Sequence, residues 1–198
     1  MKYDLDEVSR IRNDLVTFTR MAYARGLSSG VSGNPSARLP TTPSLVLIKG
    51  TGKCFGEVGP EDFVLVDLDC NLIDGAVKPS KEVRFHCGIY KERPEVGAVF
   101  HGHSPYATAY VTAKGKMDFV TAASRALIGD SAVVDFAPAG SEDLAAMVVD
   151  AFKDKSVKCC LLKTHGFVTV GADIAKAYYM GDVLEDNAKT VSIMASYK

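Results

Sequence analysis

Two of the chain's four histidines lie one residue apart, directly after an apolar run, in FHGHSPYATAYV at residues 100–111. In an extended strand, His101 and His103 point to the same face with their Cα atoms about 6–7 Å apart, so both imidazoles can reach one ion. A pair of hydrogen-bonded histidines at a strand end fits this spacing equally well. A third ligand would favour the metal.

His165 supplies a candidate third ligand, because it also follows an apolar, strand-like run and precedes a glycine, in LLKTHGFVTVG. Ends of neighbouring strands in an α/β sheet converge on crevices where ligands bind. Three neutral histidines with an open position form a catalytic zinc arrangement, in which the ion acts as a Lewis acid on a carbonyl or enolate oxygen. The same set would accept manganese, cobalt or iron, since selectivity in the cell depends on supply.

Glu82, in KPSKE, is the carboxylate expected to do chemistry beside this metal. It lies at a predicted helix start, where backbone N–H groups and Ser80 could receive a phosphate. A carboxylate near a Lewis acid can remove a proton next to a carbonyl, and partial burial is expected to raise its pKa for that task. The alternative is an ordinary first-turn glutamate favoured by the helix dipole. His86, four residues later, is expected to be an outer contact or a packing residue rather than a ligand.

Two glycine-containing loops are candidate anion sites, SGN at residues 32–34 and GTGK at residues 50–53. Glycine permits close approach of the backbone to phosphate, and amides in turn conformations can form an anion-binding nest. Neither loop has the spacing of a Walker or dinucleotide fingerprint, so a simple turn is the alternative for each.

A layered scaffold is expected to position these residues. Apolar residues at steps of three and four predict a helix over residues 6–25, and strand-like runs then alternate with helical ones. Strands are expected at 36–38, 44–52, 63–74, 96–104, 131–138 and 157–166, and helices at 78–94, 104–113, 140–154 and 173–196. This alternation predicts an α/β domain with a central sheet covered by helices, and leaves the strand directions open.

Composition favours a cytoplasmic, single-domain protein, spanning residues 1–198, that acts on a small molecule. At 47% hydrophobic content one core is sufficient, and 23 Lys and Arg against 24 Asp and Glu provide no field for binding nucleic acid or an anionic membrane. No signal peptide is recognisable, and no apolar run approaches the roughly 20 residues that cross a bilayer. Five cysteines without a CxxC spacing argue against a disulfide framework or a thiolate zinc site.

The ordered motifs SGNPSAR, GTG, KPSKEVRFH, HGHSPYATA and LLKTHGFVTVG resemble the class II aldolase/adducin family over roughly residues 8–192. The resemblance implies a three-layer α/β/α domain with a largely antiparallel central sheet. It also implies a homotetramer with active sites between subunits. The implied activity is zinc-dependent cleavage of a phosphorylated ketose, similar to L-fuculose 1-phosphate, to dihydroxyacetone phosphate and an aldehyde.

By this resemblance, His101, His103 and His165 are zinc ligands, and Glu82 is both the catalytic acid/base and the fourth ligand of the resting metal. The residues implied to hold the substrate phosphate are Gly33, Asn34, Thr51, Gly52, Ser80 and Lys81. Epimerases of the family usually carry aspartate at the position of Glu82, which favours an aldolase.

Two residues depart from the aldolase pattern and keep alternatives open. Lys81 replaces a serine, as in the 3-oxo-tetronate 4-phosphate decarboxylase branch, and its charge could bind phosphate or a substrate carboxylate. Arg125 lies in a region where a tyrosine proton donor is expected, and it is a candidate contact for a substrate anion. The chain also stops at Lys198, before the tail expected of such an aldolase. The alternatives are a decarboxylase or epimerase of this family, or a non-catalytic adducin-like module.

Overall fold

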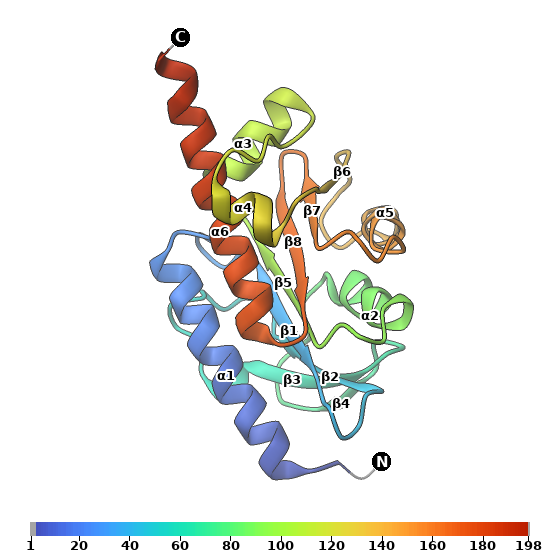
Figure 1. Ribbon diagram of the computed structural model, residues 1–198. Helices are drawn as coiled ribbons and strands as arrows, with labels where there is room; N and C mark the ends of the chain where they lie inside the picture. The colour runs from blue at the N-terminus through green and yellow to red at the C-terminus, as the bar shows by residue number, and fades with distance from the viewer. Residues whose placement is uncertain (1–2, 198) are drawn as a thin grey trace.

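The computed structural model describes residues 3–197 and has one central sheet between two helical layers (Figure 1). The strand order is β4-β3-β2-β1-β5-β8-β7-β6. The strands are β1 (Asn34–Arg38), β2 (Leu45–Lys49), β3 (Phe63–Asp67), β4 (Leu72–Asp74), β5 (Ala98–Gly102), β6 (Ala132–Val134), β7 (Cys159–Leu162) and β8 (Gly166–Gly171). Within the described residues only the β6–β7 pair is parallel, which confirms the largely antiparallel sheet. Lys198, the end of the predicted domain, lies outside the described residues.

Helices cover both faces of this sheet (Figure 1). One layer contains α1 (Leu5–Ala24), α3 (Pro105–Lys114), α4 (Ala122–Leu127) and α6 (Ile174–Met194), and the other contains α2 (Val83–Glu92) and α5 (Glu142–Ala151). Each face buries its own apolar cluster, and the adjacent residues Leu47 and Ile48 belong to different clusters because side chains alternate along a strand. Within residues 3–197, none of the helices combines the length and apolarity that crossing a bilayer requires.

Two helices begin near the residues that the sequence predicts. Asp4 caps α1 by accepting hydrogen bonds from the amides of Asp6 and Glu7. Ser104 is the N-cap of α3 and Pro105 its first residue, as expected from a residue with a fixed φ and no N–H. These two helices are therefore confirmed close to their predicted bounds.

Two expectations about secondary structure are wrong in detail. The run 63–74 is a hairpin of β3 and β4, because the Asp67 carboxylate accepts from the amides of Asp69 and Asn71 and closes a turn. Helix α2 begins at Val83 rather than near Pro79, because residues 78–80 are held in extended form beside the end of β2. The sequence pattern indicates no element for the segments that form β8 and α4.

A buried carboxylate of α6 holds the start of α3. Glu185 is 9% exposed and accepts from the amides of Tyr106 at 3.0 Å and Ala107 at 2.8 Å, which have no acceptor within their own helix. Glu185→Ala is expected to lower the free energy of unfolding by about 1–3 kcal/mol, measured by urea denaturation. The control is Asp186→Ala, at the exposed neighbouring position, which is expected to change the free energy of unfolding by less than about 0.5 kcal/mol. Equal losses in the two variants would contradict this role.

Candidate metal centre and active site

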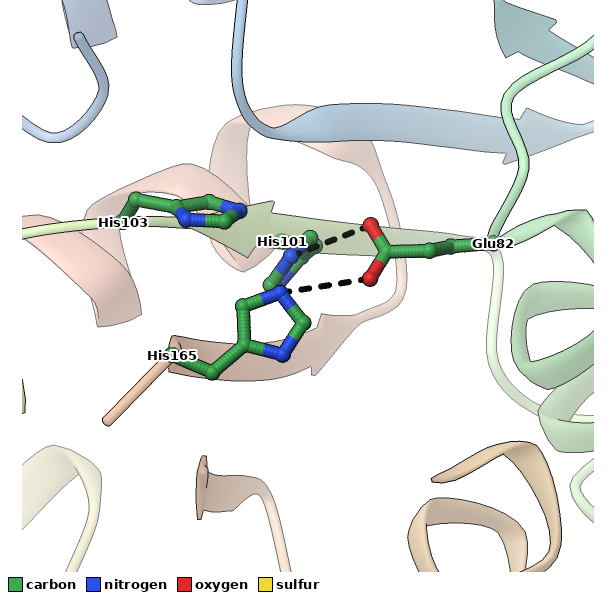
Figure 2. Close-up of side chains that lie close together, drawn as sticks. All are labelled: Glu82, His101, His103 and His165. Atoms are coloured by element: carbon green, nitrogen blue, oxygen red, sulfur yellow. Dashed lines mark ion pairs between the residues drawn. The ribbon is translucent and has the colours of Figure 1, made fainter. Parts of the chain in front are cut away.

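Glu82, His101, His103 and His165 meet beyond the end of β5 (Figure 2). One potential ligand atom from each lies within 4.8 Å of all the others. The ring centroids of the three histidines are 4.6–5.0 Å apart. The structure therefore brings together the two histidines of the HxH pair, the histidine from a second strand run and the carboxylate from a third segment.

Glycine residues allow the segments that carry the histidines to approach closely. A Cβ atom built on Gly166 would lie 2.1 Å from the carbonyl oxygen of Gly102, so a larger residue would push β8 away from β5. His103 follows Gly102 and His165 precedes Gly166. The glycine beside each histidine thus accounts for the 4.7 Å separation of these two rings.

Glu82 is positioned by a short pairing between the residues before α2 and the end of β2. The Ser80 amide donates to the carbonyl of Lys49 at 3.1 Å, and the Thr51 amide donates to that of Lys78 at 3.0 Å. The Glu82 amide then donates to the Ser80 hydroxyl at 3.2 Å. Because this segment is held from both sides, the carboxylate of Glu82 is directed at the histidines, with only 6% of the residue exposed.

The donor atoms of the cluster fit a cation. Glu82 Oε2 lies 3.2 Å from His101 Nε2, and Glu82 Oε1 lies 3.3 Å from His165 Nε2 (Figure 2). Even so, Oε1 and both nitrogens are buried without a well-formed hydrogen bond, which is unusual for polar atoms in a protein interior. His101 Nδ1 donates to the carbonyl of Phe167 at 2.8 Å, which leaves the Nε2 lone pair of a neutral ring directed at the shared centre. Three imidazoles and a carboxylate form a set that zinc accepts.

Burial and mutual charge shift the pKa of each group in the cluster. Burial alone would raise the pKa of Glu82, but His101, His165 and Asn34 outweigh it and hold that pKa well below its usual range. This overturns the expected upward shift and keeps the carboxylate ionised. Burial, followed by the charges of His101 and His165, lowers the pKa of His103 to about 3. For His101, burial opposes protonation, but the Glu82 carboxylate prevails and the pKa is raised. A cation would therefore compete with a proton for His101 Nε2.

A cavity of about 240 Å³ opens onto this cluster. Its lining includes every residue expected to hold phosphate, namely Gly33, Asn34, Thr51, Gly52, Ser80 and Lys81, together with Glu82, His103 and His165. Gly33 adopts a φ of +77°, and a Cβ there would lie 2.9 Å from the carbonyl oxygen of His101. A glycine is therefore required where this loop passes the candidate metal ligands.

Arg125 and His86 do not line this cavity. Arg125 is exposed on α4, where its Nε donates to the carbonyl of Phe119 at 2.9 Å. The structure thus does not bring it to the site of its own chain. His86 is fully buried and does not belong to the group of candidate ligands, in line with an outer contact.

Lys49 also lines the cavity, although the sequence pattern indicates only a strand residue at this position. It is 1% exposed, and its Nζ donates a 3.3 Å hydrogen bond to the carbonyl of Gly50. Burial, partly offset by the charge of Asp62, lowers its pKa to about 8. A lysine that ends an apolar strand run and directly precedes a glycine-containing loop is the signal that could identify it.

The pKa of Lys49 predicts a specific pH dependence of stability. In the unfolded chain this lysine has a pKa near 10.5, so between pH 8 and pH 10.5 the unfolded state binds more protons and stability rises with pH. Lys49→Met is expected to remove this rise and to raise the free energy of unfolding at neutral pH by about 3 kcal/mol. Denaturant titrations across this pH range measure both effects. The control is Lys53→Met, because Lys53 is half-exposed; a rise that persists in Lys49→Met would contradict the assignment.

Residues 13–192 match the family described as Class II Aldolase and Adducin N-terminal domain, and the chain belongs to this family. The L-fuculose phosphate aldolase of Methanococcus maripaludis is 35% identical over 185 residues, which cover 93% of this chain and 98% of that protein. The 3-oxo-tetronate 4-phosphate decarboxylase of Haemophilus influenzae is 32% identical over 180 residues, covering 88% and 83%. The crystal structure of YgbL from Escherichia coli superimposes with a TM-score of 0.86 at 27% identity, covering 94% and 90%. The resemblance inferred from the motifs is thus confirmed.

Proposed function

We propose that this chain is a zinc-dependent aldolase that cleaves a phosphorylated ketose similar to L-fuculose 1-phosphate to dihydroxyacetone phosphate and an aldehyde. The observation that carries the proposal is that the glutamate–histidine cluster and the expected phosphate-binding loops line one cavity. The relative from Methanococcus maripaludis named L-fuculose phosphate aldolase supports the same choice.

Glu82, His101, His103 and His165 would hold the metal. Bound zinc would supply a Lewis acid that stabilises negative charge on the substrate oxygens next to the reacting carbon; manganese, cobalt or iron could substitute. The loops at Gly33 and at residues 51–52, with Ser80, would fix the phosphate through backbone amides and a hydroxyl.

Glu82 moves the proton at C3 in this proposal. During cleavage the ionised Glu82 carboxylate takes the proton of the C4 hydroxyl as the C3–C4 bond breaks, and the electron pair left on C3 then takes that proton from Glu82. In the reverse direction the ionised carboxylate removes that proton from C3 of dihydroxyacetone phosphate. The low pKa of Glu82 in the metal-free protein is consistent with the ionised form that starts the synthetic direction.

The test measures bound metal and the release of dihydroxyacetone phosphate from L-fuculose 1-phosphate and L-ribulose 1-phosphate. Near-stoichiometric metal and chelator-sensitive release are the expected results. Metal without release from either sugar would reject the proposed aldolase in favour of the decarboxylase or epimerase branch. Protein that binds no added metal would indicate an adducin-like module.

A decarboxylase of a 3-oxo-tetronate 4-phosphate is the second candidate, and Lys81 is the observation that favours it. Lys81 lines the cavity and adds a positive charge that could pair with a substrate carboxylate. The Haemophilus influenzae relative with this name is 32% identical. Release of carbon dioxide from such an acid, lost in Lys81→Ser, would support this reaction; retention in that variant would remove the argument from Lys81.

A homotetramer with active sites between subunits completes the proposal. Arg125 is exposed on α4 and does not reach the cavity of its own chain, so we assign it to the site of a neighbouring subunit, where it would contact a substrate anion. Mass measurement by light scattering tests the assembly. A monomer with full activity would reject both the tetramer and the role of Arg125.

A further inference from the structure

A chain of buried hydrogen bonds extends from Tyr90 to Glu82 between α2 and the sheet. The hydroxyls of Tyr90 and Ser36 are 2.8 Å apart, and Ser36 Oγ lies 2.7 Å from His86 Nδ1. His86 Nε2 lies 2.6 Å from Asn34 Oδ1, and Asn34 Nδ2 lies 2.8 Å from Glu82 Oε2. All five residues are at most 6% exposed, so water does not compete for these bonds.

The donor and acceptor of each link follow from the Glu82 end. An ionised carboxylate can only accept, so Asn34 must turn its NH₂ group to Glu82 and its oxygen to His86. That oxygen can only accept, so His86 must carry its proton on Nε2. In a neutral ring Nδ1 is then the acceptor of a hydrogen bond donated by the Ser36 hydroxyl. Ser36 in turn accepts from Tyr90, so every bond donates toward Glu82.

We propose that His86 is a positioning residue that acts through Asn34, holding the amide so that its NH₂ group fixes Glu82 Oε2 and leaves Oε1 free to serve the reaction. The geometry distinguishes the two carboxylate oxygens, because Oε1 is buried without a well-formed hydrogen bond. The catalytic consequence rests on the proposed function, whereas the orientation of Asn34 does not.

The surroundings of His86 keep it in this role. Its ring stacks on Phe85 with centroids 4.7 Å apart and planes at 19°, which prevents a ring flip without repacking. Burial, reinforced by the charge of His101, lowers the pKa of His86 to about 3, so the ring stays neutral. If Asn34 instead turned its oxygen to Glu82, two acceptors would face each other in a buried site.

The tautomer of His86 is the first test and needs no substrate. Zinc-loaded protein labelled with ¹⁵N-histidine is examined by long-range ¹H–¹⁵N NMR, with His86 assigned by comparison with His86→Gln. The expected result is a neutral ring with its proton on Nε2 across the neutral pH range. A proton on Nδ1, or a charged ring, would overturn the inference.

Variants of His86 test its effect on the cluster. In His86→Gln, an amide can still donate to Asn34, whereas His86→Leu offers no donor. Zinc affinity, measured by competition with a chromogenic chelator, is expected to fall about 10–100-fold in the leucine variant and to be largely retained in the glutamine variant. Equal affinity in the wild type and in His86→Leu would contradict positioning through Asn34.

These readouts separate the inference from the proposed reaction. If the sugar phosphates are not cleaved but tautomer and zinc affinity behave as expected, the reaction is wrong and the positioning role stands. If the sugar phosphates are cleaved but His86 carries its proton on Nδ1, the reaction stands and the positioning role is wrong. The tautomer measurement needs only the wild type and His86→Gln, so it decides the matter even if His86→Leu does not fold.

Discussion

Glu82→Gln is expected to reduce aldol cleavage, and proton exchange at C3 of dihydroxyacetone phosphate, by about 10²–10⁴-fold, the usual contribution of a positioned acid or base. Glutamine has nearly the shape of glutamate and can still accept the hydrogen bond from Asn34, but it cannot take up the C3 proton. Cleavage is measured by release of dihydroxyacetone phosphate, and exchange by NMR in deuterated water. The exchange assay needs no aldehyde, so it does not depend on which sugar is the substrate.

The zinc content of Glu82→Gln decides how a loss of activity is interpreted. His101, His103 and His165 remain in this variant, and three histidines suffice for a catalytic zinc site. Full zinc with lost exchange would assign the proton transfer to Glu82, whereas lost zinc would make Glu82 mainly a ligand. Glu142→Gln is the control, because its carboxylate on α5 is 86% exposed. Wild-type exchange in zinc-loaded Glu82→Gln would refute the assigned role.

The candidate ligands could be predicted because simple chemistry is visible in short motifs. His101 and His103 are spaced for one face of a strand, and the glycines beside His103 and His165 allow the close approach seen between β5 and β8. The strand directions were not predictable from the alternation of elements. They depend on how distant segments pair, and only the family resemblance implied them.

The errors share a physical cause, which is that long-range contacts override local patterns. The pKa of Glu82 is lowered rather than raised because the surrounding imidazoles outweigh burial, and no local motif contains those neighbours. Lys49 is buried beside a cavity that forms only when residues 78–82 pack against β2. Asn34, which is expected to hold phosphate, lines the cavity, and its Nδ2 also donates to Glu82, a partner 48 positions along the chain that no local motif contains.

Removal of the metal is expected to abolish cleavage and to destabilise the fold. Without a cation, Glu82 Oε1, His101 Nε2 and His165 Nε2 remain buried without well-formed hydrogen bonds, which costs free energy. A metal present at 1,000 times its dissociation constant stabilises the folded state by about 4 kcal/mol, so the thermal midpoint should fall on treatment with chelator. Differential scanning calorimetry and the cleavage assay measure the two effects on one sample.

Adding back different metals tests whether the cluster itself is responsible. Zinc should restore both activity and midpoint, whereas magnesium should restore neither, because it prefers oxygen ligands and this set has three imidazoles. In His165→Ala one imidazole is lost, so both the zinc-dependent rise in midpoint and cleavage should shrink sharply. If this variant responded to zinc as the wild type does, the stabilising ion would bind elsewhere. If His165→Ala lost cleavage but kept the wild-type rise in thermal midpoint with zinc, the ion that stabilises the fold would not be the ion that takes part in the reaction beside Glu82.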